Sequence, residues 1–106
     1  MNIAASDIFS DKDCAALFKA LSEEIRLRIL HILFDGEECV SGLMDKLNLA
    51  QSHVSHHLKI LKTANLIKSR RDGHKISYFL APKVKQNMSE SKKESFDLGC
   101  CEVKFK

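Results

Sequence analysis

The stretch QSHVSHHLKILKTANLIKSRRDGHKISYFL, residues 51–80, decides the fold of this 106-residue chain. Its first part predicts a helix near 51–63, because apolar residues recur there at i, i+4 and i+7 and would form one buried stripe. That stripe consists of Val54, Leu58 and Leu61. Its second part predicts a β-hairpin, because Asp72-Gly73 is a strong two-residue turn signal between strand-like residues. A helix followed directly by a basic hairpin is therefore expected in this part of the chain.

Two helices are predicted near the start of the chain. Acidic residues and apolar positions at helical spacing predict the first helix near 11–21. The second helix covers EEIRLRILHILF, residues 23–34, with Ser22 as its capping side chain. We expect Gly36 to end this helix in a left-handed conformation.

A third, short helix is predicted within ECVSGLMDKLNL, with Ser41 as a candidate cap. A brief connection at 48–50 then leads into the helix near 51–63. Two short helices joined by a three- or four-residue turn form a helix-turn-helix unit. The fold class is therefore mainly α with a two-stranded β wing, a winged helix-turn-helix.

The chain has the size of one domain, residues 1–106. Beyond the hairpin the pattern weakens, and we expect residues 83–106 to form a short C-terminal helix and a cysteine-bearing tail. The sequence shows no secretion signal and no apolar stretch long enough to span a membrane, so we expect a cytoplasmic protein with no membrane partner. In that compartment four cysteines indicate metal binding or redox chemistry rather than a disulfide framework.

The net charge of +3 is distributed unevenly along the chain. Residues 1–50 carry five Lys or Arg against nine Asp or Glu, and residues 81–106 carry six against four. Residues 51–80 carry six against one. A positive charge concentrated in one segment indicates a surface that faces a polyanion, although a solvated charged face is the alternative.

A polar face on the helix near 51–63 coincides with this basic segment. Hydrogen-bonding side chains recur on it at i, i+3, i+4 and i+7, and two more lie near the N-terminal end, which usually meets the bases in a recognition helix. The predicted base-facing residues are Gln51, Ser52, His53, Ser55, His56 and Lys59. Long cations at the hairpin tip suit backbone phosphates or the minor groove. The predicted wing contacts are Arg70, Arg71, His74 and Lys75.

Three histidines, His53, His56 and His57, invite a metal interpretation. His53 and His57 are separated by four residues, a spacing that can hold zinc. His57 also lies three and four residues from apolar stripe positions, so we expect it at the edge of the core instead. His31, inside the second helix, has no second ligand at i±4, and we expect a partly buried structural histidine.

These residues resemble the ArsR/SmtB family of bacterial winged-helix repressors over about residues 15–80. LFKALSEEIRLRIL is similar to the family's second-helix signature, and VSHHLKILKTANLI is similar to its recognition helix. The resemblance implies a dimeric protein, with the first and fifth helices forming the dimer seam. It also implies a homodimeric repressor that leaves operator double-stranded DNA when an inducer binds.

The chain departs from the family at the inducer sites. One family site is a Cys-x-Cys at the start of the third helix, where this chain has Cys39 but Ser41 at the second position. Another family site uses Asp and His on the fifth helix, and residues 81–106 contain no histidine. Both ligand sets known for the family are therefore incomplete here.

The cysteines supply another set of ligands. Cys39, Cys100 and Cys101 offer three thiols, and three thiolates suit As(III) or Sb(III), whereas Cd(II), Pb(II) and Zn(II) often recruit a further ligand. We therefore expect As(III) or another soft metal ion as inducer, and no organic cofactor. Cys14 we interpret mainly as a small residue in a packed helix.

Other interpretations of the thiols stay open. Cys39 could pair with a tail cysteine as a disulfide or polysulfide in response to oxidants or sulfide. The tail thiols could also be incidental. From a different class, the chain could be a metal-sequestering or thiol-exchange protein with a solvated basic surface. We expect no enzyme, since no nucleophile with a base at catalytic spacing and no Cys-x-x-Cys motif is present.

Overall fold

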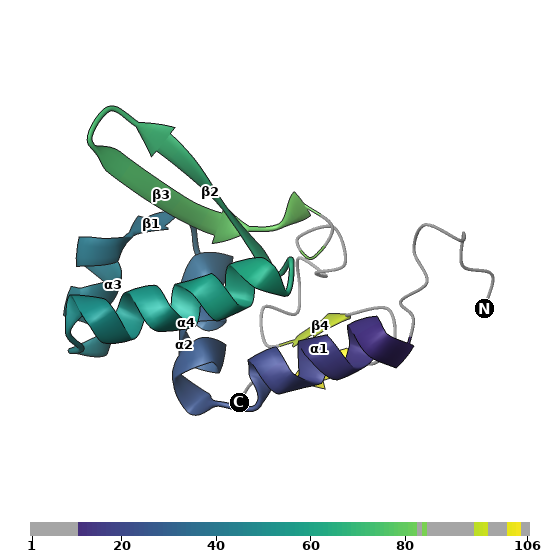
Figure 1. Ribbon diagram of the computed structural model, residues 1–106. Helices are drawn as coiled ribbons and strands as arrows, with labels where there is room; N and C mark the ends of the chain where they lie inside the picture. Colours follow the sequence, from purple (N-terminus) through teal and green to yellow (C-terminus); the bar gives the residue numbers. More distant parts are fainter. Residues whose placement is uncertain (1–10, 83, 85–94, 98–101, 105–106) are drawn as a thin grey trace.

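The computed structural model describes residues 11–82, 84, 95–97 and 102–104 (Figure 1). Four helices come first, with one short strand between the second and third, and four strands follow. The elements are α1 (Asp11–Leu21), α2 (Glu24–Phe34), β1 (Glu38–Cys39), α3 (Val40–Leu47), α4 (Gln51–Thr63), β2 (Ile67–Asp72), β3 (Lys75–Leu80), β4 (Ser95–Asp97) and β5 (Glu102–Lys104). The expected helix-turn-helix is α3–α4, and the expected wing is β2–β3, so the mainly helical winged-helix prediction is confirmed.

The core lies between the helices and the base of the wing. Apolar residues from α1, α2, α3, α4, β2 and β3 are buried in one cluster, which includes Ile29, Leu43, Leu58 and Ile67. The α4 stripe behaves as the spacing predicts, with Val54 and Leu61 completely shielded from solvent. Burial of this stripe fixes which face of α4 remains outside.

The wing belongs to a three-stranded antiparallel sheet with the order β1-β3-β2. Asp72 pairs with Lys75, so the two loop residues are Gly73 and His74, one position later than the Asp72-Gly73 turn that the sequence suggested. Gly73 has φ +64°, a left-handed conformation that glycine adopts without a Cβ penalty. The short strand β1 was not predicted; its Cys39 pairs with Ser77 of β3.

Three local predictions are wrong. The Ser22 hydroxyl donates to the carbonyl of Lys19 at 2.7 Å, so it closes the end of α1, whereas the residue preceding α2 is Glu23, without a side-chain cap bond. Ser41 lies inside α3, and the residue at the N-cap position is Cys39. His31 is exposed rather than partly buried, because it lies on the outer side of α2, and its ring packs edge-on against Phe34 at 6.3 Å.

The end of α2 differs in detail from the prediction. The helix stops before Asp35, whose backbone remains right-handed, and Gly36 follows with φ +150°, a positive angle outside the left-handed helical range. Beyond the wing, the described segments β4 and β5 pair as antiparallel strands, which the sequence did not predict. The rest of the expected C-terminal helix and tail, Cys100 and Cys101 included, lies outside the described residues. No helix in the described part of the chain combines the length and apolarity required to cross a bilayer.

Candidate DNA-binding surface and inducer site

The outer face of α4 carries every side chain predicted to meet the bases. All of these residues are exposed: Gln51, Ser52, His53, Ser55, His56 and Lys59. The opposite side of the same helix is buried by the apolar stripe and by His57. Helix α4 therefore presents a surface of hydroxyl, amide, imidazole and ammonium groups, which can hydrogen-bond to base edges and phosphates.

The turn before α4 sets the angle between the two helices of the helix-turn-helix. Asn48 ends α3 with φ 56°, a left-handed conformation that asparagine tolerates better than most residues. The N–H of Leu49 then donates to the carbonyl of Met44 at 3.3 Å. Ala50 precedes α4 and supplies no side-chain cap, so the positive end of the helix dipole faces outward near the polar face.

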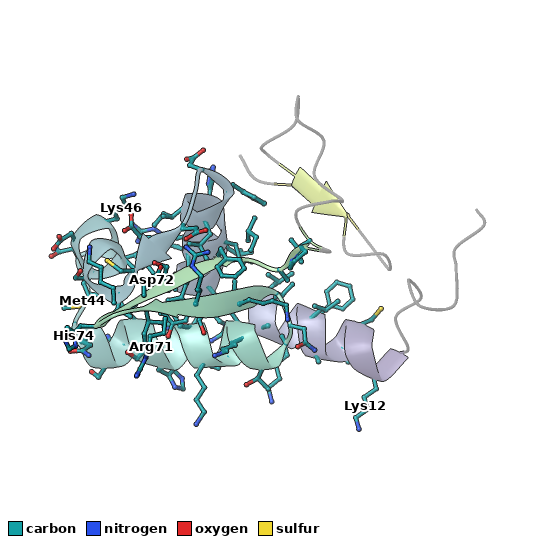
Figure 2. The ribbon with its side chains drawn as sticks, turned by 90° about the horizontal axis from the view of Figure 1, so that it is seen from above. Lys12, Met44, Lys46, Arg71, Asp72 and His74 are labelled. Carbon is teal, nitrogen blue, oxygen red and sulfur yellow. The ribbon has the colours of Figure 1, made fainter. Side chains whose placement is uncertain are left out.

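The wing is held against α4 by a direct bond. Lys62, in the last turn of α4, donates from Nζ to the hydroxyl of Ser69 on β2 at 2.8 Å. The wing tip, marked by His74, lies at the same end of the molecule as the N-terminal end of α4 (Figures 1 and 2). The exposed polar face and the wing tip are thus parts of one rigid unit.

The four predicted wing contacts fall into two groups. Arg71, His74 and Lys75 are exposed around the tip, and no ion pair is recorded for them in the described part of the chain. Arg70 instead makes a two-bond contact with Glu37, at 3.2 and 2.5 Å, and an ion pair with Asp72 at 3.2 Å. The hydrogen bond to Glu37 and, to a lesser extent, the one to Asp72 raise the pKa of the Arg70 guanidinium above its ordinary value. The structure therefore places three of the four predicted wing contacts where a phosphate could be reached without breaking an existing ion pair.

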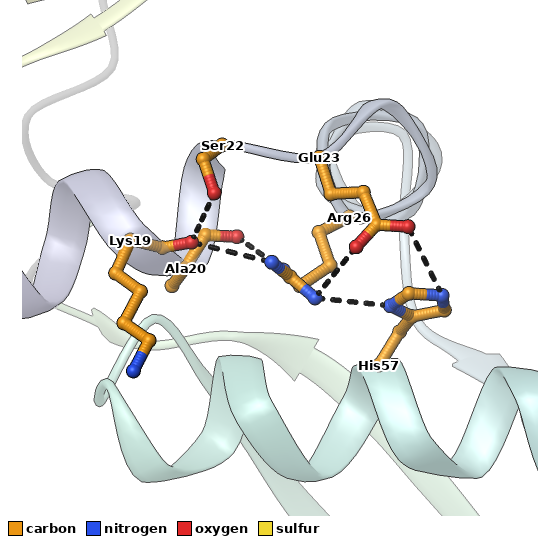
Figure 3. Close-up of polar contacts among 6 residues, drawn as sticks. All are labelled: Lys19, Ala20, Ser22, Glu23, Arg26 and His57. Carbon is orange, nitrogen blue, oxygen red and sulfur yellow. Dashed lines mark hydrogen bonds and ion pairs between the residues drawn. The ribbon is translucent and has the colours of Figure 1, made fainter.

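A buried polar network beneath α4 was missed by sequence reasoning (Figure 3). Arg26 of α2 is only 6% exposed, and its guanidinium donates to the carbonyls of Ala20 at 2.5 Å and Lys19 at 3.2 Å. The same group pairs with Glu23 at 3.3 Å and lies 3.2 Å from Nδ1 of His57. One sequence signal could have indicated that Arg26 is buried. It lies three and four residues before the core residues Ile29 and Leu30, on the same face of α2.

Cys39 lies where the thiol site was predicted, at the N-terminal end of α3. Its Sγ is 3.2 Å from the hydroxyl of Ser41, and its N–H donates to the Glu38 carboxylate at 3.2 Å. The hydrogen bond with Ser41, then the backbone N–H of Gly42 and the charge of Lys75, lower the pKa of the Cys39 thiol; burial and Glu38 oppose them. The thiolate is the form that binds soft metals and reacts with oxidants, so this environment favours the chemistry expected of Cys39.

The rest of the predicted inducer site is not tested by this structure, because Cys100 and Cys101 lie outside the described residues. Cys14 is half-buried on α1. Within the described segments, no three His, Cys, Asp or Glu side chains come close enough together to hold a metal ion. The alternative pair of zinc ligands is disfavoured, since His57 is turned toward Arg26 whereas His53 is exposed.

Comparison with known proteins gives the family. A model described as "Bacterial regulatory protein, arsR family" matches residues 23–69. The chain is 40% identical over 67 residues to an uncharacterised HTH-type transcriptional regulator of Methanocaldococcus jannaschii, covering 62% of this chain and 75% of that protein. It is 38% identical over 71 residues to an arsenical resistance operon repressor of Staphylococcus aureus, covering 67% and 68%. The chain belongs to the ArsR/SmtB family.

Other relatives and solved structures agree with this assignment. A cadmium resistance transcriptional regulatory protein homologue of Staphylococcus aureus is 36% identical and is covered over 57% of its length, against 64% of this chain. The structure of reduced HlyU from Vibrio cholerae superposes with a TM-score of 0.65 at 36% identity, covering 71% of this chain and 80% of that one. A homodimeric winged helix-turn-helix DNA-binding domain from Mycobacterium bovis gives 0.66 at 28% identity, covering 78% and 80%. Members of the ArsR/SmtB family are DNA-binding transcriptional regulators, so this chain is a regulator and not an enzyme.

Proposed function

We propose that this ArsR/SmtB protein is a homodimeric repressor that binds operator double-stranded DNA and leaves it when a thiophilic inducer binds. The observation that carries the proposal is the exposed polar face of α4 beside the exposed cations of the wing tip, both fixed to one core. Relatives named as repressors support repression rather than activation of transcription. A homodimeric relative supports two copies of this surface per assembly.

The proposed DNA contacts fall into two chemical groups, base contacts from α4 and phosphate contacts from the wing tip. Ser55 and His56 lie on the outer face of α4, where short polar side chains can reach base edges and carry specificity. Arg71 and Lys75 at the wing tip suit phosphates, which position the protein and make affinity depend on salt. In a two-fold dimer the two α4 helices would read two half-sites about one helical turn apart.

The first helix supplies a surface that a second copy would cover. Phe18 is 53% exposed on α1, the one large apolar side chain that is exposed in the described part of the chain. The family resemblance assigns the dimer seam to this helix. Burial of a large aromatic ring gives a dimer part of its stability, which a monomer of this size gains from.

The proposed inducer is As(III) or Sb(III), bound by Cys39, Cys100 and Cys101 as thiolates, or another soft metal ion. Relatives named for arsenical and cadmium resistance support a metal inducer in general. The lowered pKa of Cys39 supports thiolate binding at that residue. Cys39 pairs with β3 of the wing sheet, so a ligand that pulls on Cys39 acts on the wing.

The DNA proposal is tested by binding to a duplex selected from random sequence, with an unrelated duplex as reference. Ser55→Ala or His56→Ala should weaken specific binding more than nonspecific binding, by about 1–3 kcal/mol per lost base contact. His31→Ala is the matched control, because His31 is an exposed histidine on α2, outside the polar face of α4 and the wing. Equal losses on both duplexes would undo the base-reading assignment.

The inducer proposal is tested by anaerobic titration of the fully reduced protein with arsenite. One ion per chain, three thiols consumed and release of DNA would support the three-cysteine site. Cys100→Ser should keep DNA affinity but abolish release by arsenite, and a variant that still responds would remove Cys100 from the site.

A thiol-redox or persulfide-sensing repressor is the second candidate, favoured by the same acidic Cys39 thiol. It predicts that arsenite leaves the thiols free, whereas an oxidant that takes up two electrons, or a persulfide that is reduced to thiol and sulfide, joins Cys39 to a tail cysteine and releases the DNA.

A further inference from the structure

The hydrogen bond between Arg26 and His57 fixes the protonation state of the histidine. Nη1 of Arg26 lies 3.2 Å from Nδ1 of His57, and a guanidinium has only N–H donors and stays charged. Nδ1 must therefore accept the bond and carry no proton. The ring is neutral with its hydrogen on Nε2, which lies 3.9 Å from a carboxylate oxygen of Glu23.

This bond connects the recognition helix to the corner of the two preceding helices (Figure 3). The other N–H groups of Arg26 bind carbonyls near the end of α1 and the carboxylate of Glu23, the residue that precedes α2. His57 is 8% exposed and lies directly after His56, which is on the outer polar face. A rotation of α4 that moves His57 away from Arg26 therefore moves the base-facing residues as well.

We propose that the Arg26–His57 hydrogen bond is a positioning contact for DNA binding, and that protonation of His57 breaks it and weakens DNA binding in mild acid. The inference rests on the proposed DNA contact of α4. A proton on Nδ1 would point at the guanidinium, so the ring must turn or the helix must shift. Arg26 cannot yield a proton at any ordinary pH, so only the histidine side of the bond can adjust.

The charges around His57 set the direction of the effect. Glu23, just before α2, and Arg26 of α2 face it, His53 and His56 are its titratable neighbours on α4, and α1 contributes the two carbonyls held by Arg26. Burial lowers the pKa of His57 most, the carboxylate of Glu23 opposes this, and Arg26 and the two neighbouring imidazoles add to the lowering. The ring is thus neutral at neutral pH, and the contact is lost only as the solution becomes acidic.

The experiment compares His57→Asn with His57→Gln. Asparagine places an acceptor near the position of Nδ1 and does not titrate, whereas glutamine places its amide near Nε2. At pH 7.5, His57→Asn should bind the selected duplex within about threefold of the native protein, and His57→Gln should bind about tenfold more weakly, as expected for a lost hydrogen bond to a charged group. Between pH 7.5 and 5.5 the native protein should lose affinity progressively relative to His57→Asn, by less than about tenfold at pH 5.5, because the pKa of the ring is lowered from 6.5. His53, His56 and His74 are present in both proteins, so the ratio reports the change at position 57.

Nitrogen-15 NMR of the imidazole rings gives a readout that needs no DNA. The native protein at pH 7.5 should show His57 with its proton on Nε2, and acidification should shift α4 amide resonances further in the native protein than in His57→Asn, which has no imidazole at position 57. Parallel pH profiles for the two proteins, or a proton on Nδ1, would overturn the inference. Failure of the native protein to bind any duplex would instead overturn the proposed function, and the NMR comparison would still decide whether His57 positions α4.

Discussion

Arg70 of β2 forms a bidentate ion pair with Glu37, thirty-three residues earlier in the chain. Nη1 of Arg70 lies 3.2 Å from Oε2 of Glu37, and Nη2 lies 2.5 Å from Oε1. The same guanidinium pairs with Asp72 and lies 5.8 Å from the centre of the Phe79 ring. Arg70 therefore fastens the wing to the segment that precedes β1. The adjacent Arg71 is exposed, with no recorded ion pair in the described part of the chain.

The first prediction separates these two arginines by salt dependence. Arg71→Ala should weaken DNA binding on every sequence and reduce the slope of log affinity against log salt by about one, because one phosphate contact is lost. Arg70→Ala should change that slope by well under one, because two carboxylates already balance its charge. Fluorescence anisotropy with a labelled duplex at several salt concentrations measures both slopes.

Glu37→Gln serves as the control for this comparison. It removes the partner charge of Arg70 without touching the wing tip, so it should leave the contribution of Arg71 to the slope unchanged. Equal slope changes for Arg70→Ala and Arg71→Ala would mean that Arg70 leaves its carboxylates to reach a phosphate.

The second prediction concerns the two faces of α4. Leu58→Ala should lower the free energy of unfolding by about 2–5 kcal/mol, because it empties space in the core. Ser55→Ala should change it by less than about 0.5 kcal/mol, because the residue is exposed. Urea denaturation followed by circular dichroism gives both values. A large loss of stability in Ser55→Ala would show that this side chain supports the fold, and its loss of DNA binding would then say nothing about base contacts.

Local sequence signals were enough to predict α4 and the wing: apolar spacing for the helix and a turn dipeptide for the hairpin. Val54, Leu58 and Leu61 repeat at one spacing, and a stripe of this kind dictates the buried face whatever packs against it. The hairpin was placed to within one residue, because Gly73 adopts a positive φ and lies in the loop in either register of the turn.

Features that depend on tertiary contact could not be predicted in this way. Nothing local to Arg26 shows that its guanidinium meets the end of α1 and a histidine thirty-one residues later. The Ser22 hydroxyl had two helix ends within reach, and the sequence does not say which it closes. The same limit applies to Arg70, whose charge suggested a phosphate although it pairs with Glu37.

The third prediction tests the acidity of Cys39 in a variant in which Cys14, Cys100 and Cys101 are serine. Ser41→Ala should raise the pKa of the thiol and slow alkylation by iodoacetamide at pH 7 roughly threefold, because it removes the strongest hydrogen bond to sulfur. Glu38→Gln should lower the pKa and speed alkylation, because it removes a nearby negative charge. Alkylation rates from pH 6 to 10 give each midpoint. Identical midpoints in the three proteins would mean that the local contacts do not set the reactivity of Cys39.

The fourth prediction follows from the lowered pKa of His57. In the folded protein the ring takes up a proton at lower pH than the ordinary value of 6.5 that applies after unfolding. Between these two values the unfolded chain binds more protons, so the free energy of unfolding falls as the pH is lowered from 6.5 and is unaffected by His57 above it. His57→Asn should remove the contribution of His57 to this pH dependence. The free energy of unfolding of the variant should therefore decline less than that of the native protein between pH 7 and 5. Urea titrations across this range measure the difference, with His31→Asn as a control on an exposed histidine. A native protein and His57→Asn that decline together would show that His57 takes up its proton equally well in the folded and the unfolded chain, so that its contact with Arg26 does not lower its pKa.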